Sequence, residues 1–164
     1  MRRRIIWSRA FKPIEIKVDD VTSPAMLALL QTHANLMLAL SPPGSCHFLP
    51  AEGLRAPDVT VWSMWDEEVL VGCGALKELP GGVGEVKSMH TRSDLRGQGH
   101  GRRMLEHIMA EAEQRNYSAL YLETGSMVGF LPARRIYEAY GFVYCSPFGD
   151  YTLDPNSVYM HRAL

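Results

Sequence analysis

The sequence predicts a single α/β domain whose mostly antiparallel sheet is flanked by helices. Strand-like and helix-like segments alternate along most of the 164 residues, and a glycine-rich turn joins a strand-like segment to an amphipathic helix. An apolar content of 46% is enough for an ordinary core, and the length suits one domain. We therefore expect residues 13–164 to form one domain and residues 1–12 to be a flexible leader.

The first predicted elements are a strand and a helix. Residues 14–18 alternate apolar and polar side chains, which is typical of a half-buried strand. A helix is predicted over residues 24–40, because Ser23 can cap its first turn and the next residue is a proline, which is favoured at the first helical position. A Pro-Pro-Gly sequence ends this helix. Residues 45–57 are expected to form a short helix or a loop.

Three antiparallel strands are predicted next. Residues 59–65 and 69–79 are rich in β-compatible side chains and are separated by a charged turn, which predicts a hairpin. A Pro-Gly-Gly turn then leads into a third strand over residues 83–91. These strands are expected to form the first half of the sheet.

The run Arg-Gly-Gln-Gly-His-Gly at residues 96–101 is the most informative segment. Its glycines can bring bare N–H groups close to an anion, and the following helix directs the positive end of its dipole to the same place. That helix is predicted by apolar residues at helical spacing: Met104, Leu105, Ile108, Met109 and Ala112. The spacing fits neither a Walker loop nor a dinucleotide fingerprint. It predicts a phosphate site of another type, or a turn without a ligand.

The last third of the chain contains the remaining strands. Residues 119–123 predict a buried strand. Residues 142–146 and 158–161 are expected to form a terminal hairpin around the long loop 147–156. Two aromatic side chains in this loop favour an ordered functional lid over a disordered tip.

Two segments resemble signatures of the GCN5-related N-acetyltransferase (GNAT) family. Residues 96–101 fit Arg-x-x-Gly-x-Gly, which binds the diphosphate of acetyl-coenzyme A in that family. Residues 133–142 fit its second signature, Ala-x-x-x-Tyr-x-x-x-Gly-Phe. The order of elements also resembles the family's mixed, mostly antiparallel sheet. The resemblance is specific over residues 59–146 and weaker elsewhere.

The resemblance implies that acetyl-CoA is the co-substrate. The expected cofactor-binding residues are Met89, His90, Thr91, Arg96, Gly97, Gln98, Gly99, His100, Gly101 and Arg102. One position departs from the family, in which an asparagine often stands seven residues before the signature tyrosine; here it is Phe130. The asparagine contact is then lost, or replaced by Ser126, Thr124 or Arg134. Alternatively, Phe130 forms an apolar wall against the cofactor.

Transfer of an acetyl group to an amine needs a group that accepts a proton and a group that donates one. By resemblance, Tyr137 protonates the leaving thiolate; the alternative is a core aromatic. Glu85 stands eleven residues before Arg96, at the position of the base in the histone-acetylating branch. Its alternative is an ion pair with Lys87. No cysteine lies in either signature, which favours direct transfer over a cysteine relay.

The acceptor is expected to be a small amine, an amino acid or a peptide amine. The expected substrate-binding residues are His47, Glu123, Asp150 and Tyr151, in segments that border the acceptor cleft of the family. Acidic groups there would suit a cationic amine, although single histidines such as His33 and His47 are more often structural. The alternative function is a non-catalytic acyl-CoA sensor or interaction protein on the same fold.

Composition argues against several other classes. A net charge of −1 disfavours nucleic-acid binding. The three cysteines are widely spaced, so neither a disulfide framework nor a metal site is expected. The basic start lacks a long apolar stretch, and no stretch reaches membrane-spanning length, so we expect a cytoplasmic protein. The family fold often dimerises through its last strands, which makes a homodimer one option.

Overall fold

A computed structural model describes residues 13–164, so the expected leader at 1–12 lies outside the described residues. The strands are β1 (Glu15–Val18), β2 (Val59–Asp66), β3 (Val69–Leu79), β4 (Val83–Thr91), β5 (Ala119–Gly125), β6 (Val143–Cys145) and β7 (Ser157–Ala163). The α-helices are α1 (Pro24–Leu40), α2 (Ala51–Leu54), α3 (His100–Gln114) and α4 (Leu131–Ala139). The predicted α/β class and order of elements are confirmed, including the short helix within residues 45–57.

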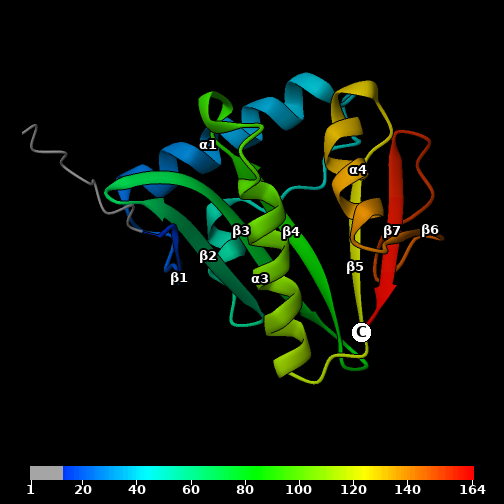
Figure 1. The fold of residues 1–164 in the computed structure, drawn as a ribbon. Coiled ribbons are helices and arrows are strands. Elements are labelled where there is room, and N and C mark those ends of the chain that lie inside the picture. Colours follow the sequence, from blue (N-terminus) through cyan, green and yellow to red (C-terminus); the bar gives the residue numbers. More distant parts are fainter. Residues whose placement is uncertain (1–12) are drawn as a thin grey trace, which may run out of the picture.

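The strands form one seven-stranded mixed sheet in the order β1-β2-β3-β4-β5-β7-β6. Every neighbouring pair is antiparallel except β4 and β5, which are parallel. These two strands pair only at Gly84 with Leu120 and at Glu85 with Tyr121. Figure 1 shows them close together at one end and well apart at the other. The sheet is therefore open on one side, between the second halves of its central strands.

Two cores cover the two faces of the sheet. Helices α1 and α2 pack against one face through a cluster that includes Val21, Met26, Leu29, Leu30, Leu54, Val61, Leu70, Cys73 and Ala75. Helices α3 and α4 pack against the other face, as α3 does in the foreground of Figure 1, through a cluster that includes Trp62, Val86, Leu105, Ile108, Leu120, Phe142 and Met160. The apolar stripe predicted for α3 is buried in this second cluster.

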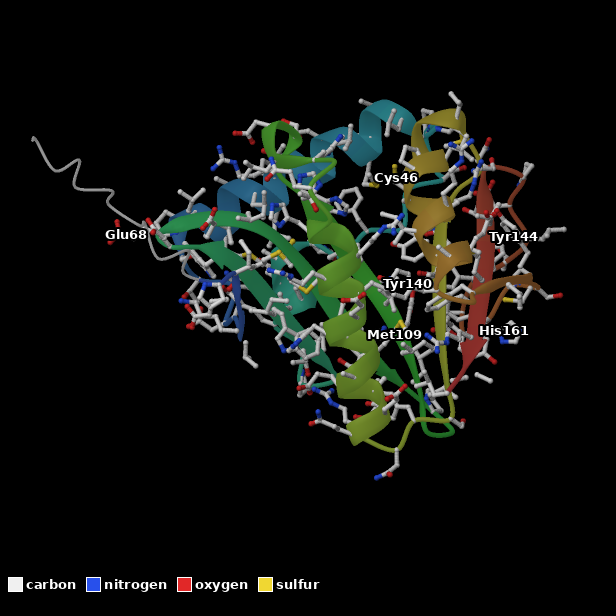
Figure 2. The ribbon with its side chains drawn as sticks, in the orientation of Figure 1. Cys46, Glu68, Met109, Tyr140, Tyr144 and His161 are labelled. Atoms are coloured by element: carbon white, nitrogen blue, oxygen red, sulfur yellow. The ribbon has the colours of Figure 1, made fainter. Side chains whose placement is uncertain are left out.

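Local sequence explains how the helices begin and how they are held. The Ser23 hydroxyl accepts a hydrogen bond from the Met26 N–H at 3.2 Å, as expected for an N-cap. Tyr140 lies between α3 and α4 (Figure 2), and its hydroxyl donates to Glu106 Oε1 at 2.5 Å.

Within residues 13–164, no helix is both long and apolar enough to cross a membrane.

A β-bulge interrupts the pairing of β3 with β4. Cys73 pairs with His90 and Ala75 pairs with Lys87, so Ser88 and Met89 together face Gly74. Gly74 has no room for a side chain, since an added Cβ would lie 2.7 Å from the Met104 Cγ. The bulge therefore lies at a tightly packed point of β4, on the half of the strand that has left β5.

The buried face of α3 is expected to dominate stability. Leu105 is fully buried whereas Leu153 is 85% exposed. Leu105→Ala should lower the free energy of unfolding by about 2–5 kcal/mol, because it removes buried methyl groups and leaves a cavity. The matched variant Leu153→Ala should change it by less than about 0.5 kcal/mol. Urea unfolding measures both, and similar losses would contradict the assignment of this core.

Candidate active site

The N-terminus of α3 has the features of an anion-binding site. Gly99 is its N-cap residue, with φ 84°, and Gly97 has φ 77°, so both use the left-handed region that favours glycine. No side chain caps this end, and its first turn contains no acidic residue. The first N–H groups of a 15-residue helix are thus left for an external acceptor.

A cavity of about 670 Å³ starts at this helix end and extends along β4 and α4. Of the expected cofactor residues, all except Gln98 line it. Gln98 lines a separate groove beside Tyr140, so the structure does not place its side chain with the others. Arg96 and Arg102 contribute two exposed positive charges at the loop end. The other end is bounded by apolar side chains of α1 and α4.

A second, smaller cavity of about 130 Å³ lies where β4 and β5 have separated. Both cavities are lined by His33, Met37, Met89, Phe130, Ala133 and Tyr137. The two spaces therefore meet along shared walls. The smaller one is also lined by Glu85, Lys87 and Glu123 on the strands and by His47 before α2.

Tyr137 stands where the two cavities meet. Its ring belongs to the α3–α4 core and lies 5.9 Å, centroid to centroid, from the ring of Phe142. Burial, and then the charge of Glu123, raise the pKa of Tyr137 to about 12. The hydroxyl is therefore protonated at neutral pH. The residue is both part of the core and part of both cavity walls.

Glu85 takes part in a buried charge cluster with Lys87 and Tyr151. The Lys87 ammonium donates to Glu85 Oε1 at 2.9 Å and to the Tyr151 hydroxyl oxygen at 3.0 Å. The Tyr151 hydroxyl donates to the same Glu85 oxygen at 2.5 Å. Burial and the neighbouring Glu85 charge raise the pKa of Tyr151. The ion pair weighed as an alternative for Glu85 is thus present, and loop 147–156 is anchored to β4.

Glu123 on β5 and His47 before α2 also line the smaller cavity. Burial raises the pKa of the Glu123 carboxyl, while nearby Ser157, His47 and Lys87 oppose the rise. His47 Nε2 is buried and lacks a hydrogen bond within residues 13–164, and lies 3.9 Å from Asp154 Oδ2. A buried ring nitrogen without a hydrogen-bond partner is expected at a site where a ligand can supply that partner.

Asp150 is not brought to this site. It is exposed on a turn and lines neither cavity; of the four residues expected to bind the acceptor, only His47 and Glu123 line the smaller cavity. Tyr151, its neighbour in the chain, points inward to the Glu85 cluster instead. The turn at Gly149 and Asp150 leaves this acidic side chain in solvent.

Two buried histidines join α1 to β4 beside both cavities. His33 Nδ1 and His90 Nδ1 lie 3.2 Å apart, so one ring donates a hydrogen bond to the other. Burial lowers the pKa of each to about 4, and the charges of His33 and Arg96 add to the shift at His90. Both rings are neutral at pH 7. Their positions in one contact could not be read from two single histidines in the sequence.

Some wall residues were not expected from the sequence. In the sequence, Lys87 is recognisable only as a partner of Glu85, and the apolar end of α1 has no signal for a cavity. Phe130 lines both cavities, as the apolar-wall alternative required. Of the residues considered in place of the missing asparagine, Thr124 lines the smaller cavity, whereas Arg134 lines neither cavity and donates to the Gly125 carbonyl at 2.8 Å. Cys46, seen near the end of α1 in Figure 2, also lines the smaller cavity.

Comparisons with known proteins show which family this fold belongs to. The family profile of the acetyltransferase (GNAT) family matches residues 30–142. The uncharacterized N-acetyltransferase YsnE of Bacillus subtilis is 49% identical over 151 residues, which cover 92% of this chain and all of the relative. The structure assigned as an acyl-CoA N-acyltransferase from Klebsiella pneumoniae has a TM-score of 0.75 and 28% identity, over 92% of this chain and 97% of its own.

A third comparison concerns the cofactor. A B. subtilis acetyltransferase determined in complex with CoA has a TM-score of 0.65, over 93% of this chain and 99% of its own. Its 13% identity makes it a likeness of fold alone. With the family profile covering most of the chain and a close relative covering nearly all of it, the chain belongs to the GNAT family of N-acetyltransferases and is an acyltransferase.

Proposed function

We propose that this protein transfers the acetyl group of acetyl-CoA directly to the amino group of a small amine, amino acid or peptide. One observation carries the proposal: a cavity that begins at an anion-binding helix end and a smaller cavity with buried carboxylates meet at Tyr137. A phosphate-bearing donor and an amine acceptor could therefore reach one point from opposite sides.

The larger cavity suits coenzyme A. The uncapped first turn of α3 and the positive charges of Arg96 and Arg102 would hold the diphosphate. The apolar walls of α1, α4 and Phe130 would enclose the pantetheine arm. When bound, acetyl-CoA supplies an activated acetyl thioester. The residues of the cavity orient this thioester and exclude water from it.

Tyr137 is the residue we assign to the leaving thiolate. A phenol whose pKa is raised keeps its proton across the neutral range and can deliver it when a stronger base forms beside it. The buried Cys73 does not offer a covalent route, because burial raises the pKa of its thiol to about 12. We therefore assign the larger cavity to direct transfer from acetyl-CoA, with Tyr137 as the proton donor.

The smaller cavity favours a cationic acceptor. It contains the carboxylates of Glu85 and Glu123 and one ammonium, that of Lys87. A volume of about 130 Å³ favours a small amine or the end of a larger molecule. Acceptor roles for His47 and Glu123 fit this arrangement, whereas Tyr151 would act through Glu85 and Lys87, and Asp150 lies outside both cavities.

Cellular location and oligomeric state stay as predictions. A cytoplasmic location rests on the widely spaced cysteines. A homodimer through the last strands would use β6, where Val143 and Tyr144 are both more than half exposed at the edge of the sheet.

The proposal is tested by incubating the protein with acetyl-CoA and a panel of amino acids, dipeptides and linear diamines. Mass spectrometry should detect an acetylated product for at least one amine class. Binding of CoA without any product would favour the sensor alternative. Absence of CoA binding would contradict the assignment of the larger cavity.

CoA affinity should depend on Gly101. An added Cβ there would lie 3.7 Å from the Ile136 Cδ1 and 3.8 Å from the Thr91 Oγ1, which is ordinary contact, so Gly101→Val should fold. Its branched side chain would occupy the approach to the N–H groups of α3, and calorimetry should find CoA binding abolished. Gln114→Val, at the exposed far end of the same helix, should bind CoA normally. Equal affinities in the two variants would contradict the phosphate site.

Tyr137→Phe should lower kcat on the order of a hundredfold and leave CoA affinity unchanged, because only a proton donor used during the reaction is removed. Tyr140→Phe is the matched control, since Tyr140 lines neither of the two joined cavities. Steady-state kinetics on the best amine of the panel compares them. Wild-type turnover in Tyr137→Phe would leave Tyr137 with a core role alone.

A further inference from the structure

The smaller cavity holds two carboxylates in different electrostatic environments. Glu85 accepts hydrogen bonds from both Lys87 and Tyr151, and its side chain and that of Lys87 are 5% and 9% exposed. Both donors bind the same oxygen, Glu85 Oε1, so this carboxylate already serves as the counter-charge of a buried ammonium, and breaking such a pair is costly.

Glu123 has the opposite environment. Within residues 13–164 it forms no ion pair, because the nearest ammonium, that of Lys87, donates to Glu85 and Tyr151 instead. It lies on β5, after the last residue that pairs with β4, and lines the cavity together with Tyr137. Its carboxylate thus lines the smaller cavity, and its charge acts on Tyr137, which lines both cavities.

We propose that Glu123, rather than Glu85, removes the proton from the acceptor amine, and that Glu85 acts as the fixed counter-charge of Lys87. This inference rests on the proposed function. Two carboxylates in one site thereby take different roles, set by their partners.

The proposed step balances as follows for a cationic acceptor. Glu123 accepts one proton from the ammonium, and the freed lone pair forms the nitrogen–carbon bond to the acetyl carbon. The carbon–sulfur bond breaks, and Tyr137 gives its proton to the thiolate. The acceptor nitrogen loses a second proton as the amide forms, and this proton returns to the Tyr137 phenolate. Glu123 then releases the proton that it accepted to solvent. No oxidant, metal or covalent enzyme intermediate is needed.

The surroundings of Glu123 determine its titration. Burial raises its pKa, and the neighbouring Glu85 charge adds to the rise. The groups that face it are Glu85 and Lys87 from β4, His47 from the segment before α2, Tyr137 from α4, Tyr151 from the long loop, and Ser157 and Tyr159 from β7. A raised pKa makes the carboxylate a stronger base while leaving it ionised above that pKa.

The test compares pH profiles of kcat/KM for the amine that the wild type acetylates fastest. In the wild type, kcat/KM should rise with pH through the raised Glu123 pKa and then level off. Glu123→Gln should lose about a hundredfold or more at pH 7, and its remaining activity should keep rising toward the amine pKa of about 10, because only the free amine can then react. Glu123→Asp should restore part of the plateau.

A second measurement does not need turnover. In protein labelled with ¹³C at glutamate side chains, one carboxyl resonance should titrate above the ordinary range and disappear in Glu123→Gln. It should persist in Glu78→Gln, a control at an exposed position of β3 that should also keep wild-type kinetics. Retention of the plateau in Glu123→Gln, or titration of Glu123 in the ordinary range, would overturn the assignment. A wild type that acetylates no amine would refute the proposed function, and this inference with it.

Discussion

The structure depends on the short pairing of β4 with β5. Parallel hydrogen bonding is limited to Gly84–Leu120 and Glu85–Tyr121, and beyond this point the backbones separate. Helix α3 covers one face beside the gap, while α1 lies on the other face and reaches its edge. A continuous sheet would have filled this space with ladder hydrogen bonds. Because it opens, side chains from both strands can line a common cavity that meets the one leading from the glycine loop.

The charges of the site follow from this opening. Glu85 is the last β4 residue paired with β5, and there the Lys87 ammonium pairs with it and the Tyr151 hydroxyl donates a hydrogen bond to it. Glu123 lies farther along β5, in the opened region, without such partners. Glu123 stands two residues beyond Tyr121, the last β5 residue paired with β4, and this offset gives the two carboxylates of the site different partners. Tyr137, fixed in the core through its ring, presents its hydroxyl at the same junction.

Much of the fold was predictable because its signals are local. Alternation in residues 14–18, the Ser23–Pro24 start of α1 and the apolar stripe of α3 each determine an element without reference to the rest of the chain. The glycine loop was recognisable for the same reason. The charge cluster of Glu85 was only half predictable, since Lys87 is a same-face neighbour on one strand whereas Tyr151 arrives from a distant loop. The His33–His90 contact and the exposure of Asp150 depend on packing between elements, which no local pattern encodes.

The central claim is that the two cavities form one site with Tyr137 at their junction. A crystal structure of the protein with CoA tests it most directly. We expect the diphosphate on the N–H groups at the start of α3 and the thiol sulfur beside the Tyr137 hydroxyl. A CoA molecule whose sulfur end points away from Tyr137, or whose diphosphate lies elsewhere than at the glycine loop, would contradict it.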